Sequence, residues 1–376
     1  MNSELPATGA DQVGIPVVAL DRHGLRLYHE GDAYYDALHA DLAQAQQEIR
    51  WECYILASDE VGMPLLQTLM ARSRAGCRVQ LRIDAFGSHD VFDERLQQAL
   101  TDSGIELSWC RRWSWRQPLT YHRRNHRKLV VIDQRCFYLG GYNLHRESSR
   151  RSVGEKRWRD THLRVSGALV EDATRAFEAY GSPRRWWRRW RQRRTDLGYL
   201  LPNLGLRRRF LLYRLYRRRI NAARQRVWVT TPYFVPPTPL QRVLVKAAKR
   251  GVDVRVLVPR RIDIELVQWA SRAAYARLLR GGVRVFEYLP RMLHAKVLQV
   301  DADWATVGTA NMDYRSLFIN DELVLVLREP DACAALADQF VADLELAEEV
   351  NGSGWSRRPW LAWLAELIGW WARRWL

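Results

Sequence analysis

The chain has 376 residues, a formal net charge of +17 and five cysteines. A chain of this length can bury two cores of ordinary size. The cysteines are odd in number, scattered and without a CxxC pair, which excludes a disulfide framework or a zinc site as the organising feature. The excess of basic residues implies a polyanionic partner, either nucleic acid or an anionic lipid surface, and charge alone does not choose between them.

The N-terminal half alternates between helical and extended patterns. Residues 1–20 have the composition of a flexible tail, and they contain no apolar segment of signal-peptide length. No run of 18 apolar residues occurs in the chain, so we expect a cytosolic or peripheral protein. In chain order the patterns predict a helix from residue 31, a strand at 51–57, a helix at 63–75, a strand at 77–84, a helix at 91–103 and a strand at 105–110.

A group of residues suited to chemistry follows in the stretch YHRRNHRKLVVIDQRCFYLGGYNLHRE, at residues 121–147. His126 and Lys128 are separated by one residue, Asp133 follows the lysine by five residues, and Asn143 follows the histidine by seventeen. The β-branched run before Asp133 predicts a buried strand, whose alternation puts His126 and Lys128 on one face. This pair suits a bound phosphate, because the ammonium is a compact charge and imidazole titrates near neutral pH. The glycines before Asn143 would let the backbone approach a ligand closely.

The same residue types recur in the second half at one constant offset. His294, Lys296, Asp301, Gly308 and Asn311 each lie 168 residues after their counterparts. A single His beside a Lys is usually a surface or packed residue, but two copies at one spacing make coincidence a poor explanation. Both aspartates are counted in the catalytic motif, yet an Asp that closes a strand is commonly a turn or ion-pair residue, so a structural role is expected for both.

The second half also repeats the order of helices and strands. The patterns predict helices at 214–226, 240–251 and 266–282, and strands at 227–236, 252–259 and 283–290. We therefore predict an α/β fold of two similar α/β/α-sandwich lobes, at residues 21–181 and 210–350, related by pseudo-twofold symmetry.

Two segments outside the lobes combine arginine with tryptophan. Residues 182–209 form an Arg/Trp-rich linker, for which a solvated basic face and stacking on bases are the alternatives to a membrane contact. Residues 351–376 carry six tryptophans and four arginines, and on a helical projection the large apolar side chains fall on one half. This segment is too short and too charged to cross a bilayer, so we expect a membrane-interface helix; the alternative is a helix that packs on its own lobe.

The duplicated HxKxxxxD motif with its trailing glycine and asparagine resembles the signature of the phospholipase D superfamily. The resemblance implies that the two halves join both motifs around one phosphodiester, with no metal and no other cofactor. One histidine would attack phosphorus and the other would protonate the leaving alcohol, while both lysines and both asparagines hold the phosphate oxygens. It also implies a carboxylate downstream of each motif histidine that orients the imidazole. The candidates are Asp160 and Glu322, which lie 34 and 28 residues past the motif histidines.

Within this superfamily, phrases such as GDAYYDAL, LHAKV and WATVGTANMDYRS resemble bacterial cardiolipin synthases that lack N-terminal transmembrane helices. The resemblance implies transfer of a phosphatidyl group from one phosphatidylglycerol to another lipid alcohol, with release of glycerol. It further implies peripheral association with the cytoplasmic face of the bacterial inner membrane. We expect His126 to be the nucleophile and His294 the acid and then the base, with the exchange of these roles left open.

Two alternative activities use the same chemistry. One is hydrolysis of phospholipids, in which water is the acceptor, and the other is cleavage of nucleic acid, which the tryptophan-rich segments disfavour. The sequence predicts neither the oligomeric state nor the second lipid substrate, phosphatidylglycerol or phosphatidylethanolamine.

Overall fold

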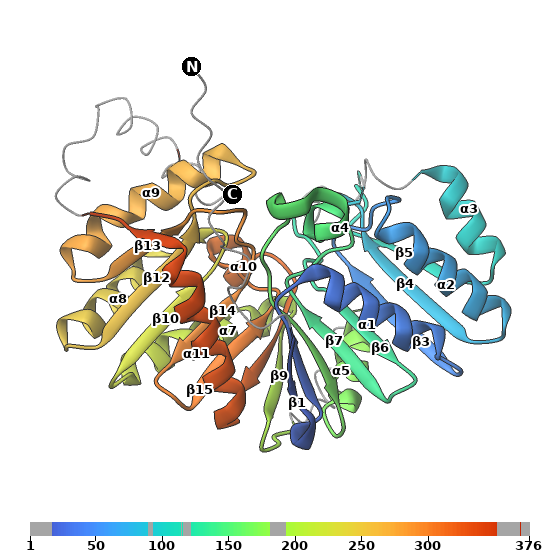
Figure 1. The fold of residues 1–376 in the computed structure, drawn as a ribbon, viewed down its shortest axis with the longest axis horizontal. Helices are drawn as coiled ribbons and strands as arrows, with labels where there is room; N and C mark the ends of the chain where they lie inside the picture. Colours follow the sequence, from blue (N-terminus) through green and yellow to red (C-terminus); the bar gives the residue numbers. More distant parts are fainter. Residues whose placement is uncertain are drawn as a thin grey trace.

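The computed structural model describes residues 17–88, 93–113, 115, 122–180, 193–351 and 369. Two lobes lie side by side, and each is built on one eight-stranded sheet (Figure 1). The predicted α/β fold of two similar lobes is therefore confirmed.

The first lobe contains a mixed sheet in the order β1-β2-β8-β7-β6-β3-β4-β5. Strands β3, β4 and β5 are parallel, and every other neighbouring pair is antiparallel. Its strands are β1 (Val17–Leu20), β2 (Leu25–Tyr28), β3 (Glu48–Cys53), β4 (Arg78–Asp84), β5 (Glu106–Cys110), β6 (Leu129–Ile132), β7 (Cys136–Gly140) and β8 (His162–Ser166). Its helices are η1 (Asp21–His23), α1 (Gly31–Ala43), α2 (Gly62–Arg74), α3 (Glu94–Asp102), η3 (Arg146–Ser148), α4 (Arg150–Val153), η4 (Gly154–Lys156) and α5 (Val170–Ala179).

The second lobe has the order β18-β13-β12-β10-β14-β15-β17-β9, which repeats the first sheet from β2 to β5 and adds β18 beside β13, at the edge opposite to that of β1. Its strands are β9 (Gly198–Asn203), β10 (Arg226–Thr230), β12 (Asp253–Pro259), β13 (Arg284–Tyr288), β14 (Val297–Val300), β15 (Trp304–Gly308), β17 (Glu322–Leu327) and β18 (Ala347–Glu349), with a separate pair β11 (Phe234–Val235) and β16 (Met312–Asp313). Its helices are α7 (Gly205–Ala222), α8 (Thr238–Lys249), α9 (Glu265–Arg280), α10 (Tyr314–Phe318) and α11 (Pro330–Glu345). The parallel trio β10, β12 and β13 corresponds to β3, β4 and β5 of the first lobe.

Two expected boundaries differ from the structure. The expected N-terminal tail at 1–20 includes β1, which pairs with β2, and the expected linker at 182–209 includes β9 and the start of α7. Strand β9 is hard to read in the sequence because it contains Gly198 and Pro202. Its place at the edge of the sheet, paired only with β17, tolerates a proline that has no N–H to donate. The Arg/Trp-rich part of the linker, at 181–192, lies outside the described residues.

Among the described residues, the hydrophobic core has three large parts and one small cluster of Val235, Val267 and Ala270. Helices α1, α2 and α3 cover the outer face of the first sheet, and α7, α8 and α9 cover the outer face of the second. The third part lies between the lobes, where α5 and α11 pack on the inner faces of both sheets in one continuous cluster. Strands β6, β7, β14 and β15 are consequently buried on both faces, which explains their short, predominantly apolar sequences.

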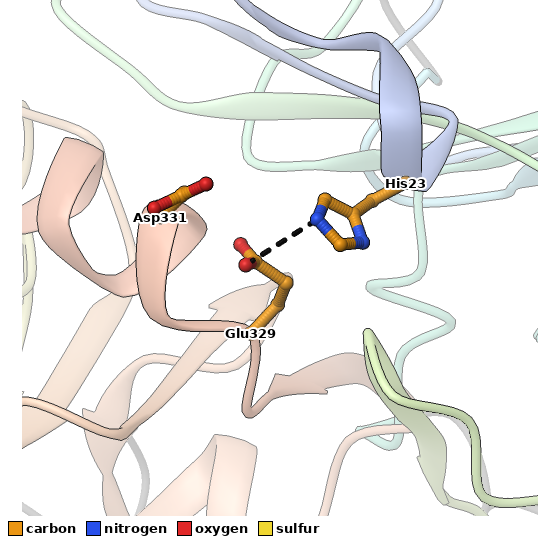
Figure 2. Close-up of side chains that lie close together, drawn as sticks. All are labelled: His23, Glu329 and Asp331. Carbon is orange, nitrogen blue, oxygen red and sulfur yellow. Dashed lines mark ion pairs between the residues drawn. The ribbon is translucent and has the colours of Figure 1, made fainter.

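Polar contacts also tie the lobes together. In the interior, the guanidinium of Arg159 binds the carboxylate of Asp343 on α11 with both ends of the fork, at 2.7 and 3.2 Å. At the periphery, His23 of η1 lies 3.4 Å from Glu329, which caps the N-terminus of α11 beside Asp331 (Figure 2). Buried apolar surface and specific contacts between oppositely charged side chains therefore set the relative position of the lobes together.

The expected membrane-interface helix at 351–376 lies outside the described residues, except for its first residue and Gly369. Gly369 is helical and buried against α9, so closely that a Cβ at this position would lie 2.5 Å from the backbone nitrogen of Ala270. Among the residues that the structure describes, no helix has the length and apolar character needed to cross a bilayer.

Candidate active site

The two motif histidines lie at the junction of the lobes, each just before the first strand of a hairpin. His126 precedes β6 and His294 precedes β14. The backbone N–H of His126 donates to the carbonyl of Asp321 in the second lobe at 3.0 Å, and that of His294 donates to the carbonyl of Arg159 in the first lobe at 2.7 Å. Return bonds run from Asp321 N–H to the Arg124 carbonyl and from Arg159 N–H to the Met292 carbonyl. Each lobe thus fixes the backbone that carries the other lobe's histidine.

The two candidate orienting carboxylates also cross between the lobes. Glu322 of the second lobe places both carboxylate oxygens 3.1 Å from Nδ1 of His126, and Asp160 of the first lobe lies 2.6 Å from Nδ1 of His294. The sequence spacing associated each carboxylate with the histidine upstream in its own lobe, but the structure exchanges the partners. The reason is that each carboxylate residue directly follows the residue whose backbone carbonyl accepts the hydrogen bond from the histidine N–H of the other lobe.

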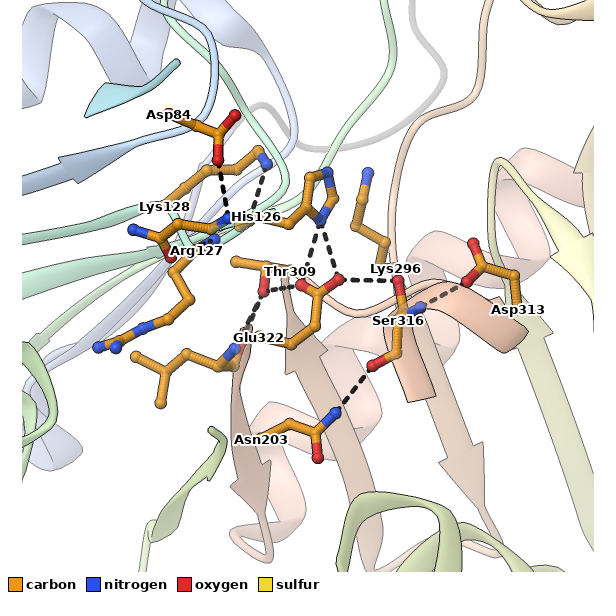
Figure 3. Close-up of polar contacts among 12 residues, drawn as sticks. Asp84, His126, Arg127, Lys128, Asn203, Lys296, Thr309, Asp313, Ser316 and Glu322 are labelled. Carbon is orange, nitrogen blue, oxygen red and sulfur yellow. Dashed lines mark hydrogen bonds and ion pairs between the residues drawn. The ribbon is translucent and has the colours of Figure 1, made fainter. Parts of the chain in front are cut away.

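The surroundings of the two carboxylates differ. Glu322 accepts hydrogen bonds from the hydroxyl groups of Thr309 and Ser316, which lie on either side of it beneath His126 (Figure 3). Asp160 instead accepts from the backbone N–H of Thr161, and Gly141 leaves the space that its carboxylate fills. Thr309 and Ser316 were not among the predicted site residues. The only sequence signal for them is their position within the second repeat.

The glycines of the motif have a different role from the expected one. A Cβ on Gly141 would lie 2.0 Å from Oδ1 of Asp160, and a Cβ on Gly140 would lie 2.5 Å from the backbone of His162 on β8. A Cβ on Gly308 would lie 2.4 Å from the Leu323 carbonyl. These glycines therefore allow the neighbouring strand and carboxylate to approach, whereas the sequence analysis assigned the space to a ligand.

The two motif lysines are buried beside the histidines. Lys128 donates to the carbonyl of His126 at 3.0 Å, and Lys296 lies 3.8 Å from the carboxylate of Asp160. Burial lowers the pKa of Lys128 to about 8 and that of Lys296 to about 7, against the opposing charges of the nearby carboxylates. Both ammonium groups thus lose a proton readily near neutral pH in the free protein, and an anionic ligand would favour their protonated form.

The histidines themselves differ in proton affinity. Burial lowers the pKa of His126, and the charge of Glu322 partly offsets this effect. Burial and the charge of Lys296 lower the pKa of His294 to about 3, so this imidazole stays neutral at physiological pH. Because each Nδ1 faces a carboxylate, each Nε2 is left to face the ligand.

The motif aspartates lie at the far ends of the first hairpin strands. Asp133 accepts hydrogen bonds from the backbone N–H groups of Gln46, Gln47 and Glu48, and Asp301 accepts from three consecutive N–H groups, those of Arg224, Gln225 and Arg226. Burial alone would raise the pKa of Asp133, but these backbone donors lower it below its usual range. Both aspartates tie a loop to the end of a strand, and neither lines the pocket.

A pocket of about 560 Å³ opens above the paired histidines. Both motif histidines and both motif asparagines line it, so the structure brings together the two halves of the predicted site at one cavity. The remaining wall residues, none of which the sequence analysis singled out, are Tyr54, Ile55, Phe86, Gly87, His122, Arg124, Trp158, Tyr233, Val235, Asp263, Ile264, Val267, Asp313, Arg315 and Asn320.

One group of side chains in the described part of the chain has the spacing of a cation site, and it lies away from this pocket. His23, Glu329 and Asp331 place their ligand atoms within 4.8 Å of one another (Figure 2). None of the three lines the pocket that holds the motif histidines. We draw no chemistry from this group.

Comparison with known proteins connects this geometry to a family. The family described as "Cardiolipin synthase, PLD-like domain" matches residues 38–171 and 216–344. Cardiolipin synthase of Geobacillus kaustophilus (strain HTA426) is 32% identical over 356 residues, covering 90% of this chain and 69% of that protein. Cardiolipin synthase A of Pseudomonas fluorescens (strain SBW25) is 32% identical over 346 residues, covering 88% of this chain and 71% of that protein.

A solved structure shares the fold. Phosphatidylserine synthase of Haemophilus influenzae Rd KW20 superposes with a TM-score of 0.70 at 14% identity, covering 96% of this chain and 97% of that one. At this identity the likeness concerns the fold alone. The two family matches, one in each lobe, and the relatives aligned along most of the chain establish that it belongs to the cardiolipin synthase family with phospholipase D-like domains.

Proposed function

We propose that this protein is a cardiolipin synthase, which transfers the phosphatidyl group of one phosphatidylglycerol to the hydroxyl of a second lipid through a phosphohistidine intermediate. The observation that carries the proposal is the pairing of two histidines at one pocket, each held through Nδ1 by a carboxylate of the other lobe. Such a pair supplies an attacking nitrogen and a proton donor for one phosphodiester.

The reaction has two steps. In the first step, Nε2 of one histidine attacks phosphorus, and the bond between phosphorus and the oxygen of the headgroup glycerol breaks. The other histidine gives its proton to this departing glycerol. In the second, the acceptor hydroxyl gives its proton back to that histidine, its oxygen bonds to phosphorus, and the bond between phosphorus and nitrogen breaks. Lys128, Lys296, Asn143 and Asn311 would stabilise the charge on the phosphate oxygens in both steps.

The assignment of the two histidine roles follows from their proton affinities. The sequence analysis favoured attack by His126 and left the exchange of roles open. Burial and the charge of Lys296 lower the pKa of His294 to about 3 and keep that imidazole neutral, as a nucleophile must be, whereas the strongest charge acting on His126 is that of Glu322, which favours its protonated form. We therefore assign the attack to His294 and the proton transfers to His126.

Transfer to a lipid, as opposed to water, is supported by the apolar wall of the pocket. Val235, Ile264 and Val267 form one side of it, and Trp158 lies 5.1 Å from the His294 ring. Such a wall suits lipid chains and disfavours free water around the intermediate.

The direct test is an assay of the purified protein on phosphatidylglycerol vesicles and on single-stranded DNA in parallel, with the lipid products resolved. We expect cardiolipin and glycerol from the vesicles and no cleavage of the DNA. We also expect the activity to survive EDTA, because protein groups alone neutralise the phosphate in the proposed mechanism. DNA cleavage without lipid products, or a loss with EDTA that a divalent ion restores, would contradict the proposal.

The membrane contact belongs to the same proposal. The net charge of +17 favours an anionic surface, and we place the protein at the cytoplasmic face of the inner membrane as a peripheral enzyme. A protein that ends at Gly354 should bind anionic vesicles more weakly yet still act on detergent-dispersed phosphatidylglycerol. Because Gly369 packs on α9, a lower melting temperature with unchanged vesicle binding would instead assign the segment to the protein's own lobe.

A further inference from the structure

The two halves of the pocket differ in charge although the motifs match. At the offset of 168, Arg124 of the first repeat corresponds to Met292, and Arg315 of the second repeat corresponds to Glu147. Both arginines line the pocket, whereas neither counterpart does. The pseudo-symmetry is therefore broken by two guanidinium groups on one side.

Both arginines are on the His126 side. Arg124 precedes His126 by two residues, and its guanidinium packs over the ring of Phe86 at 4.7 Å. Arg315 comes from the second lobe but reaches across to the first, where it donates to the carbonyl of His122 at 2.5 Å. The ring of Tyr54 lies between the arginine pair and the histidine. Its centroid is 4.9 Å from that of the His126 ring, in an edge-on arrangement, and the charges of both arginines act on the pKa of its hydroxyl.

The two guanidinium groups lie close enough for their charges to repel. Burial lowers the pKa of Arg315, the carboxylate of Asp313 partly offsets this effect, and the charge of Arg124 lowers the pKa further. A carboxylate oxygen of Asp84 lies 3.8 Å from the guanidinium of Arg124, and the same carboxylate accepts from the backbone N–H groups of Phe86, Gly87 and Asn125. A bound anion would relieve the repulsion, and the planar donor fork of arginine matches the oxygens of a phosphate.

We propose that Arg124 and Arg315 form a subsite for a second phosphate, the one that the acceptor lipid carries and that is not transferred. This inference rests on the proposed function. The transferred phosphate already has the histidines, lysines and asparagines of both motifs. In-line displacement brings the acceptor to the side of the histidine that takes its proton, and the arginine pair lies on the side of His126, to which we assign that step. The subsite selects a phospholipid acceptor over water and over simple alcohols.

The test compares three products of one intermediate. The protein is supplied with vesicles of phosphatidylglycerol in the presence of butanol, and the yields of cardiolipin, phosphatidylbutanol and phosphatidic acid are measured. All three arise from the same phosphatidyl-enzyme, so their ratios report acceptor choice and are insensitive to a loss of folded protein or of donor binding. The variants are R124Q and R315Q, with R124K and R315K to restore the charge, and R242Q on the exposed face of α8 as a charge-matched control.

We expect the ratio of cardiolipin to phosphatidylbutanol to fall about tenfold or more in each glutamine variant, because a charge-assisted contact to the acceptor is lost. The lysine variants should recover part of the ratio, and R242Q should match the parent protein. An unchanged ratio in both glutamine variants would overturn the inference and leave the proposed function standing. Absence of every phosphatidyl product from the parent protein would overturn the proposed function itself, and the inference with it.

Discussion

The two halves of the site carry the same motif but hold it in different ways. On one side, His126 faces a glutamate that the hydroxyls of Thr309 and Ser316 support. On the other side, His294 faces an aspartate that fits only because Gly141 has no side chain. The longer side chain, that of Glu322, accepts hydrogen bonds from two hydroxyl groups. The shorter one, that of Asp160, accepts from a backbone N–H and occupies the space beside a glycine.

This difference shows what the motif determines and what its neighbours determine. The motif places a histidine and a lysine in each lobe at equivalent positions, and the surroundings then set their proton affinities. Burial and both motif lysines lower the pKa of each histidine, but the strongest charge acting on His126 is that of Glu322, whereas the strongest acting on His294 is that of Lys296. A duplicated sequence can therefore support two chemical roles without any change in the motif residues.

The largest expected effect comes from removing either histidine. H126A and H294A should each lower the turnover of phosphatidylglycerol by about a thousandfold or more, because attack and proton transfer belong to one reaction. A phosphatidyl ester of p-nitrophenol separates the roles, since this leaving group needs no proton. H126A should release p-nitrophenol far faster than H294A does. The opposite order would return the attack to His126, and near-normal synthesis by either variant would contradict a shared site.

The next effect tests the glycine that makes room for Asp160. G141A would place a Cβ 2.0 Å from the carboxylate, so the carboxylate must leave His294, and we expect kcat to fall about a hundredfold, as in D160N. The matched variant on the other side, T309A, removes one of two hydroxyl donors to Glu322 and should cost about tenfold or less. Equal losses in G141A and T309A would contradict the asymmetry of the two halves.

The pH dependence should report the lysines. Their cationic forms bind the phosphate, and their pKa values are about 8 for Lys128 and about 7 for Lys296, so kcat/KM, which already declines below this window as the proton donor His126 loses its proton, should fall further as the pH rises through it. A bound phosphate favours the charged lysines, so the fall in kcat should occur at a higher pH than the fall in kcat/KM.

The contribution of these lysines to stability changes with pH in the opposite direction to their contribution to activity. The unfolded lysine, near 10.5, binds a proton that the folded one has lost, so the free energy of unfolding rises with pH between about 7 and 10.5. Coincident pH profiles of kcat and kcat/KM would contradict this account.

The smallest effect on catalysis is expected at the motif aspartates. D133N and D301N weaken the acceptor for three backbone N–H groups, so each should lower the free energy of unfolding by about 1 to 2 kcal/mol. The kcat should stay within about threefold of the parent value, because both carboxylates lie outside the pocket. Urea denaturation and initial rates measured on the same preparations check the two statements. A large loss of kcat without a change in stability would assign these aspartates to the chemistry.

Much of the architecture could be predicted from the sequence. Helices and strands were predicted near their observed bounds wherever the periodicity was strong, as at β4 and α2. No prediction covered β1 and β9, which are edge strands that depend on pairing with a neighbour, nor β2, β8, β17, α5 and α11. Of the site residues, the histidines, lysines and asparagines were predicted by number, because each is part of a local pattern that occurs twice.

What the sequence determined by itself was the set of reacting groups, the duplication and the family resemblance, since these are properties of residue type and local spacing. The partnership of His126 with Glu322 and of His294 with Asp160 was decided only by the tertiary structure. So were the placement of Arg124 and Arg315 at one pocket and the different charges that act on the two histidines. The physical reason is that contacts between lobes, burial and the field of distant charges depend on how the two sheets pack around α5 and α11, and that packing is the sum of many apolar contacts across the whole chain.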